Sequence, residues 1–344
     1  MSENVRIGVV GYGFGGRYFH APLIHAGAGC TLAGVMTSSP DRRAEVEHDF
    51  PGTPTFSSLA DMKEAGIEAV AISTPAWTHA PLCIDAAALG LHVACDKPFA
   101  LNAAEARSSV AAAKAAGVVL SPYQNRRWDS DILTLQRVMD EGSIGVISRF
   151  ESKFERAEIG TAPPPAGGGI LRDFGSHLFD QALYLFGAVH SVYAEVDVSG
   201  RYGGDDHAFF AVLRHDNGVS SHLTGNWWQA APGPRFRVTG STGTMIIDGE
   251  DSQHERLVSF SNPAIEGDGW GSVSETNWGR IHRPTAVEVL PTERGRWDVY
   301  YPAFAKAVRG EGAVPVDAAD AVASLTLIDA AFLSASEGRV VPIS

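Results

Sequence analysis

The chain has 344 residues, of which 44% are hydrophobic, so it is long enough for two ordinary domains with packed cores. Its formal net charge of -13 opposes binding to nucleic acid or to an anionic membrane surface, and neither is expected as a partner. The three cysteines lack the spacing of a metal site or a disulfide framework, so no metal is predicted. Met1–Asn4 leads straight into an apolar strand pattern, and no later apolar run approaches membrane-spanning length. These features predict a soluble, cytoplasmic protein.

The first third of the chain alternates short β-branched runs with alanine-rich helical stretches, which is the pattern of βαβ units around a parallel sheet. Ser39 before a proline, and Asn102 before a long alanine-rich run, are expected helix N-caps. Pro22 is expected to interrupt the first helix. Six strands are predicted, at Val5–Val10, Thr31–Met36, near Thr55, Ala69–Ser73, His92–Cys95 and Val118–Ser121.

Beyond Pro122 this rhythm stops and longer alternating segments follow. Asn217 and Gly218 mark a hairpin, so a mostly antiparallel sheet is expected. The predicted strands include Val146–Phe154 and Val192–Ser199, the helices are about Asp131–Glu141, Arg172–Phe186 and about Asp317–Glu337, and the loops are Thr161–Gly169 and Glu266–Pro284.

A glycine-rich turn, "GYGFGG", lies between the first strand and its helix, and Gly11, Gly13 and Gly16 satisfy GxGxxG. Glycines at these positions allow a tight turn and close approach of the backbone to a pyrophosphate. The alternative is a turn selected for packing alone. Its position at the start of a βαβ series favours dinucleotide binding, with Phe14 and Gly15 of the same turn included in the expected site.

The end of the second strand carries no acidic residue that could bind the 2′-hydroxyl of a ribose. Ser38 and Ser39 occupy that place, and Arg42 follows on the next helix. Hydroxyl groups and a guanidinium suit a 2′-phosphate, so NADP is favoured over NAD. The alternative interpretation is an N-cap followed by solvated helix charges.

Asp173, His177 and Asp180 interrupt an otherwise apolar helical segment at spacings of four and three, which places them on one helix face. Ionisable groups on an apolar helix are costly to bury unless they pair or line a cleft. A functional role is one explanation, and a buried structural histidine held by an aspartate is the other.

Lys97 directly follows the fifth predicted strand, at the same sheet edge as the glycine turn. Pro98 ends the strand pattern there. Thr74 and Pro75 follow the fourth strand and are expected to flank the nicotinamide end of a cofactor; for His79, cofactor binding and helix capping are alternatives. A lysine and a histidine acting on one oxygen would suit hydride transfer between a carbinol and nicotinamide.

The order of GxGxxG, "STP", "DKP" and "GGGILRDFGSHLFD" resembles the glucose-fructose oxidoreductase, inositol dehydrogenase and rhizopine-catabolism family over nearly the whole chain. The stretches "VGYGFGGRYFHAPLI", "CDKPFA", "YQNRRWDSD" and "GSHLFDQAL" are most similar to its NADP-linked scyllo-inositol dehydrogenase branch. The resemblance implies an α/β fold, with an N-terminal Rossmann domain over 1–123. It also implies a C-terminal α/β domain over 124–344, whose large, mostly antiparallel open sheet forms contacts in homodimers or homotetramers.

The resemblance also implies residue roles. Lys97 would polarise the substrate oxygen, His177 would exchange the proton, and Asp173 would orient the pair or hold a neighbouring hydroxyl. Which of Lys97 and His177 is the base stays open. Asp180 would contact substrate, and Asp96, expected near the cofactor, replaces the glutamate that many members carry before the lysine.

Two functions are compatible with these residues. One is an NAD(P)-dependent dehydrogenase of a cyclitol or sugar, with Asn125, after the sixth strand, as a further substrate contact. The other is a non-enzymatic, cofactor-binding regulator of a sugar pathway. The intact set of Lys97, Asp173 and His177 favours the enzyme.

Overall fold

The computed structural model describes residues 4–164, 167–198 and 205–343. Two predicted segments extend past these bounds, because residues 165–166 of the Thr161–Gly169 loop and Ser199 of the Val192–Ser199 strand lie outside the described part. The chain divides into two compact units. Unit 1 comprises Met1–Asn125, Gln253–Trp270 and Trp297–Val322, and unit 2 comprises Arg126–Ser252, Gly271–Arg296 and Ala323–Ser344.

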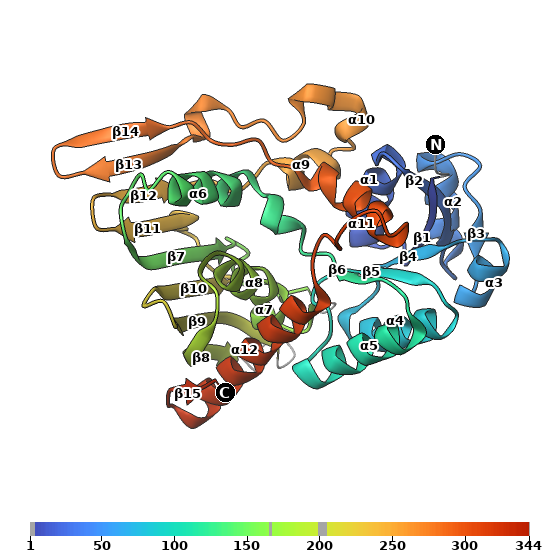
Figure 1. Ribbon diagram of the computed structural model, residues 1–344, viewed down its shortest axis with the longest axis horizontal. Coiled ribbons are helices and arrows are strands. Elements are labelled where there is room, and N and C mark those ends of the chain that lie inside the picture. Colours follow the sequence, from blue (N-terminus) through green and yellow to red (C-terminus); the bar gives the residue numbers. More distant parts are fainter. Residues whose placement is uncertain (1–3, 165–166, 199–204, 344) are drawn as a thin grey trace. The chain divides into compact units, whose positions relative to one another are not determined.

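Unit 1 is built on a six-stranded, all-parallel sheet in the order β3-β2-β1-β4-β5-β6 (Figure 1). The central strand β4 is apolar along its whole length and each of its residues is buried, as expected of a parallel strand covered on both faces. This confirms the predicted doubly wound sheet. Its strands are β1 (Val5–Val10), β2 (Cys30–Met36), β3 (Thr55–Phe56), β4 (Ala69–Ile72), β5 (His92–Cys95) and β6 (Leu120–Pro122).

The strand order places the predicted cofactor site. β1 pairs with β2 on one side and with β4 on the other, so the direction in which the chain builds the sheet reverses between β1 and β4. In open α/β sheets, ligands bind beyond the carboxyl ends of the strands at such a reversal. The glycine turn follows β1, and Ser73 and Thr74 follow β4, so both lie at that point.

The predicted helix ends of unit 1 are confirmed. The Ser39 and Asn102 side chains accept hydrogen bonds from backbone N–H groups of the first turns, and Gly117 ends α5 with φ of 68°. Pro22 lies where a π-helical turn gives way to a regular helix, because proline cannot donate a backbone hydrogen bond. The segments are η1 (Gly15–His20), α1 (Ala21–Ala26), α2 (Pro40–Asp49), α3 (Leu59–Glu64), η2 (Ala76–Thr78), α4 (His79–Ala88) and α5 (Ala103–Ala116), and α4 and α5 pack side by side in Figure 1.

Two later segments return to unit 1, although they were expected in the second domain. The Tyr300 hydroxyl donates to the carbonyl oxygens of Ser121 and Pro122, at 3.0 and 3.1 Å, and the Ser121 hydroxyl donates to that of Val316 at 2.9 Å. These long-range bonds join the returning segments to β6, the edge strand of the parallel sheet. The returning elements are α9 (Gln253–Val258), α10 (Pro263–Glu266), η6 (Gly267–Gly269), η8 (Trp297–Val299) and α11 (Tyr300–Val308).

Unit 2 contains a nine-stranded sheet in the order β14-β13-β12-β11-β7-β10-β9-β8-β15. Only the β7–β10 pair is parallel among the described pairings, which confirms the mostly antiparallel sheet. Phe150, Ser152 and Phe154 alternate with more exposed residues along β7, so one face of the strand is buried. The strands are β7 (Ile147–Glu155), β8 (Val189–Val198), β9 (Asp206–His215), β10 (Ser220–Asn226), β11 (Phe236–Gly240), β12 (Thr244–Ile247), β13 (Gly279–Arg283), β14 (Ala286–Leu290) and β15 (Val341–Pro342).

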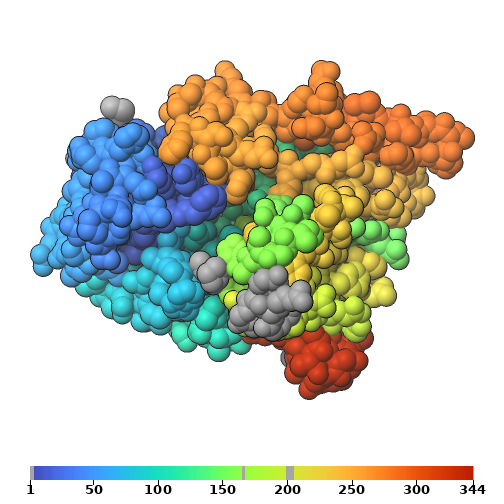
Figure 2. All heavy atoms as spheres, turned by 180° about the vertical axis from the view of Figure 1, so that it is seen from behind, coloured from blue at the N-terminus to red at the C-terminus, as the bar shows by residue number. Residues whose placement is uncertain are grey.

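The Asn217–Gly218 hairpin is confirmed between β9 and β10, with Gly218 at φ of 88°. The loop expected over Glu266–Pro284 is wrong in its last part, because Gly279–Arg283 forms β13 and pairs with β12 and β14. The β13–β14 hairpin projects from the rest of its sheet (Figures 1 and 2). Unit 2 also contains η3 (Asn125–Trp128, beginning in unit 1), α6 (Ser130–Asp140), α7 (Ile170–Asp173), α8 (Gly175–Phe186), η7 (Glu275–Asn277) and most of α12 (Ala318–Glu337).

Helix α12 is long and apolar enough to cross a membrane by length and composition alone, so the expectation that no run reaches that length is wrong. Half of its apolar window is buried inside the protein. The core helices of soluble proteins pass the same test, so this helix is weak evidence for a membrane span.

Candidate active site

The three motif glycines each meet a different requirement. Gly11 has φ of 93°, a conformation that favours glycine, and a Cβ there would lie 2.5 Å from the Ser73 carbonyl oxygen. A Cβ on Gly16 would collide with the Gly11 carbonyl oxygen, so Gly16 lets the helix pack against the turn. Gly13 has no heavy atom within 4 Å of the Cβ position and no positive φ, so its lack of a side chain is not explained by packing.

The other two turn residues differ in their surroundings. Phe14 is 54% exposed, and its ring lies 5.3 Å from the rings of both Tyr18 and Phe19. Gly15 lies directly against Ser73 and Asp96, and a Cβ would come within 2.7 Å of the Asp96 carboxylate. The turn therefore rests on the loops that follow β4 and β5.

The expected ribose site follows β2. Ser38 is exposed, and the Ser39 hydroxyl accepts the Arg42 N–H at 3.3 Å as the N-cap of α2. The Arg42 guanidinium bonds the Glu45 carboxylate at 2.7 Å. The N-cap interpretation is therefore correct for Ser39.

The expected nicotinamide site is formed by the loops after β4 and β5. Thr74 and Pro75 are half-buried at the end of β4. His79 begins α4 and is 1% exposed, and both of its ring nitrogens face backbone carbonyl oxygens. Lys97 is half-buried one residue after Asp96, and its peptide bond to Pro98 is cis.

Asp96 is held by several groups of unit 1. Its carboxylate accepts the Lys97 backbone N–H at 2.8 Å and the Ser73 hydroxyl at 2.9 Å. Burial alone would raise the pKa of Asp96, but His20, Lys97 and His79 together lower it to about 2. A negative charge therefore stands beside Lys97 at neutral pH.

Asp173 and His177 lie in unit 2, where the single helix predicted over Arg172–Phe186 is wrong. It starts earlier and divides into α7 and α8 at Phe174. The Ser176 hydroxyl bonds the Asp173 carbonyl oxygen at 2.9 Å, and the His177 N–H bonds that of Phe174 at 3.1 Å, so the turn between them is tightened. The His177 ring packs edge-on against Phe154, with centroids 5.9 Å apart.

Asp180 is 1% exposed and forms a two-pronged ion pair with Arg127. The Arg127 Nε and Nη2 atoms donate to the two carboxylate oxygens at 2.9 and 2.6 Å. Asn125, predicted to contact substrate, is 6% exposed at the start of η3. The structure thus shows a firm structural bond for Asp180, which sequence spacing alone did not predict.

Sequence reasoning also missed Arg235, which is 2% exposed. Its guanidinium carbon lies 4.0 Å above the Phe154 ring centroid, and its nitrogens donate to Ser152 at 2.6 Å and Gln181 at 2.8 Å. Its Nε lies 3.3 Å from the Asp131 carboxylate. Since Gln181 is on the helix that carries His177, Arg235 anchors that helix to the sheet; a lone arginine at the start of a strand gave no signal of this.

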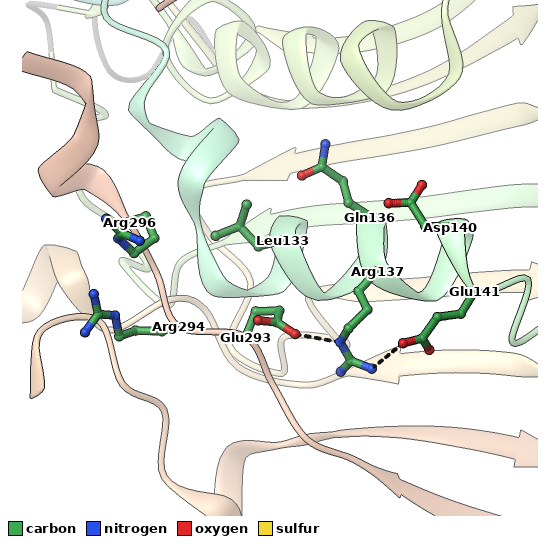
Figure 3. A pocket seen from close by; sticks show the side chains of 8 residues that line it. All are labelled: Leu133, Gln136, Arg137, Asp140, Glu141, Glu293, Arg294 and Arg296. Carbon is green, nitrogen blue, oxygen red and sulfur yellow. Dashed lines mark hydrogen bonds and ion pairs between the residues drawn. The ribbon is translucent and has the colours of Figure 1, made fainter. Parts of the chain in front are cut away.

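A pocket of about 590 Å³ lies elsewhere in unit 2, between α6 and the segment that follows β14 (Figure 3). The Arg137 guanidinium is bonded by Glu293 at 2.6 Å and lies 3.5 Å from Glu141. None of the predicted site residues lines it; its lining residues are Leu133, Gln136, Arg137, Asp140, Glu141, Glu293, Arg294 and Arg296. Within the described ranges, no group of three His, Cys, Asp or Glu side chains is arranged to hold a metal ion.

Comparison with known proteins identifies both parts of the chain. Residues 5–124 match the oxidoreductase family with an NAD-binding Rossmann fold, and residues 132–246 match the GFO/IDH/MocA C-terminal domain. The chain is 36% identical over 344 residues to the uncharacterized oxidoreductase YdgJ of Escherichia coli (strain K12), with 97% of each chain covered. It is 31% identical over 357 residues to scyllo-inositol 2-dehydrogenase (NADP(+)) IolW of Bacillus subtilis (strain 168), with 98% of this chain and 96% of that one covered.

The fold is similar over the same extent. The solved structure of YvaA from Bacillus subtilis matches with a TM-score of 0.92 and 30% identity, covering 99% of both chains. These matches confirm the resemblance that the motifs indicated. The protein is an enzyme, an oxidoreductase of the GFO/IDH/MocA family with an NAD-binding Rossmann domain.

Proposed function

We propose that the protein is an NADP-dependent dehydrogenase that oxidises a secondary alcohol of a cyclitol or sugar, or reduces the matching ketone. The assignment of a dinucleotide cofactor rests chiefly on Gly13, where the space that a side chain would fill contains no protein atom. In dinucleotide-binding turns the second glycine of the motif lets the backbone approach the pyrophosphate. The open space at Gly13 fits that use.

The same sheet edge supplies the remaining cofactor contacts in this proposal. Gly11, Gly13, Phe14, Gly15 and Gly16 would hold the pyrophosphate, and Ser38, Ser39 and Arg42 the 2′-phosphate. Thr74, Pro75 and Lys97 would surround the nicotinamide, with His79 and Asp96 beside them. The 2′-phosphate is proposed because a guanidinium and two hydroxyls replace the usual acidic residue.

The bound nicotinamide takes up or gives the hydride. Lys97 would place its ammonium group against the substrate oxygen and stabilise the charge that develops there. His177 would accept or return the hydroxyl proton, and Asp173 would orient it or hold a neighbouring hydroxyl. Lys97 and His177 remain alternatives for the base, and their joint action on one substrate is part of the proposal.

The substrate class rests on similarity. The relative IolW is a scyllo-inositol 2-dehydrogenase that uses NADP(+) and covers nearly the whole chain. A ring of hydroxyl groups would suit the polar side chains of Asn125, Asp173 and Asp180. The cytoplasmic location and the homodimeric or homotetrameric state stay predictions.

Gly13→Ala is expected to raise the Kd for NADPH by about tenfold or more, because the added methyl group would occupy the space that the pyrophosphate needs. The free energy of unfolding should stay within about 0.5 kcal/mol of wild type, since no protein atom is near. Titration of NADPH fluorescence and urea unfolding measure the two quantities.

Gly16→Ala is the matched control, because the same methyl group there collides with the Gly11 carbonyl oxygen. It should cost about 1–3 kcal/mol of stability by overpacking. If Gly13→Ala binds NADPH as tightly as wild type, the cofactor does not lie on this turn.

Arg42→Ala is expected to lower kcat/KM for NADP by about tenfold or more and to leave that for NAD nearly unchanged, because a charge-assisted bond to the 2′-phosphate is lost. Arg43→Ala is the control, since the Arg43 side chain bonds Thr37 and Ser57 instead. A wild-type kcat/KM that is higher with NAD would refute the proposed preference.

A further inference from the structure

Two buried histidines hold the turn that carries Lys97. The His79 Nδ1 lies 2.8 Å from the Pro98 carbonyl oxygen, and its Nε2 lies 2.8 Å from the Thr74 carbonyl oxygen. The side chain is 1% exposed. His79 therefore contacts both loops that the proposed function places around the nicotinamide.

The two carbonyl partners restrict which protonation states of His79 can form both hydrogen bonds. A carbonyl oxygen only accepts hydrogen bonds, so each ring nitrogen of His79 must carry a proton to bond its partner. With one ring proton, His79 ties down one loop; with both, it joins the two. Burial lowers the pKa of His79, while the Asp96 carboxylate and the two carbonyl oxygens oppose that shift.

Neither nitrogen of His79 is directed to solvent, because both face the backbone. A direct bond from His79 to a cofactor would require it to release one of these carbonyl groups. The geometry therefore favours an indirect action, in which His79 fixes the backbone of Pro98, the residue after Lys97, and the backbone of Thr74.

The opposite side of the same turn is held by His20. The Asp96 carboxylate lies 3.2 Å from the His20 Nε2, and the His20 Nδ1 lies 2.5 Å from the Tyr301 hydroxyl. The Asp96 carboxylate before Lys97 and the Pro98 carbonyl oxygen after it thus each lie close to a buried imidazole.

We propose that His79 is a positioning residue for Lys97: the imidazole lies between the Pro98 and Thr74 carbonyl oxygens, bonds one of them when neutral and both when doubly protonated, and so sets where the ammonium group stands relative to the reacting carbon. The inference rests on the proposed function, in which Lys97 acts on the substrate oxygen. A misplacement of about 1 Å at such a group can cost about a hundredfold in rate.

His79→Ala is expected to lower kcat by about tenfold to a hundredfold, with KM for substrate and Kd for NADPH within about threefold of wild type. His79→Gln keeps one amide donor and should recover part of that loss. Recovery by glutamine also separates positioning from a folding defect, should the alanine variant be too unstable to assay.

His92→Ala is the matched control. His92 begins β5, at the opposite end of the strand that leads to Lys97, and its Nδ1 accepts the Val119 N–H at 2.9 Å. Like His79, it bonds the backbone through its side chain, but at the start of β5 rather than at the end that leads to Lys97. Its kcat should stay within about twofold of wild type.

Amide hydrogen exchange of the full chain gives a readout that does not depend on turnover. The Lys97 N–H is bonded to Asp96, and its exchange should become about tenfold faster in His79→Ala, while β1 keeps its protection. Unchanged exchange at Lys97, or a loss of NADPH affinity as large as the loss of kcat, would overturn the proposal. If the wild-type protein turned over no substrate, the proposed function would fail and the exchange result would still decide whether His79 positions the turn.

Discussion

Lys97→Ala is expected to lower kcat by about 10²–10⁴-fold, the range that a positioned proton-transfer or charge-stabilising group contributes. Lys97 follows the carboxyl end of β5, and its backbone N–H bonds the anchored Asp96 carboxylate. Its removal should leave the glycine turn intact, so the Kd for NADPH should change by less than about threefold. Steady-state turnover and fluorescence titration measure the two effects.

Lys63→Ala is the control for this substitution. The Lys63 ammonium also belongs to unit 1, where it donates to the Gly90 carbonyl oxygen at 3.0 Å, and the residue is exposed. Its removal should change kcat by less than about twofold. A Lys97→Ala enzyme with near-normal kcat would remove Lys97 from the mechanism.

Arg127→Met is expected to lower the free energy of unfolding by about 3–5 kcal/mol, because it leaves the Asp180 carboxylate buried without its partner. The two side chains are only 7% and 2% exposed, so water cannot replace the lost bonds. Urea unfolding followed by circular dichroism measures the change.

The double variant Arg127→Met, Asp180→Leu distinguishes the cost of an unpaired buried charge from the cost of lost side-chain packing. Replacing both members of a buried ion pair by apolar side chains often restores stability, so the double variant should be more stable than Arg127→Met. If the single variant unfolds at the same urea concentration as wild type, this ion pair does not hold Asp180 in place.

The parallel sheet could be predicted from the sequence because its signals are local. β1 and β5 end at the predicted residues, and the N-caps at Ser39 and Asn102 bond as expected. Each of these features is encoded within a few neighbouring residues by periodicity, capping and glycine. The same is true of the Asn217–Gly218 hairpin.

The features that could not be predicted depend on contacts between distant residues. Nothing near Tyr300 indicates that its hydroxyl bonds Ser121 and Pro122, yet these bonds return the later segments to unit 1. The spacing of Asp180 from His177 suggested that its side chain lies on a helix face that meets a ligand. Only the folded structure shows that Arg127 bonds the Asp180 carboxylate.

The residues of the candidate site stay a prediction, whereas the bonds among them are seen only in the structure. The GxGxxG motif singles out three glycines, and the structure surrounds them differently: Gly11 has a positive φ, a Cβ on Gly16 would collide with backbone, and Gly13 has open space. His79 was expected either to bind cofactor or to cap a helix. Its two backbone carbonyl partners depend on Thr74 and Pro98 meeting across a sheet edge, which a single sequence does not specify.

The most direct test of the proposed dehydrogenase is to incubate the purified full-length protein with NADP and a panel of cyclitols and sugars, including scyllo-inositol, and to follow the absorbance of the reduced nicotinamide. We expect reduction of NADP with at least one cyclitol or sugar, and loss of that signal in Lys97→Ala. Binding of NADP with no oxidation of any alcohol in the panel, and no reduction of the matching ketones by NADPH, would contradict it.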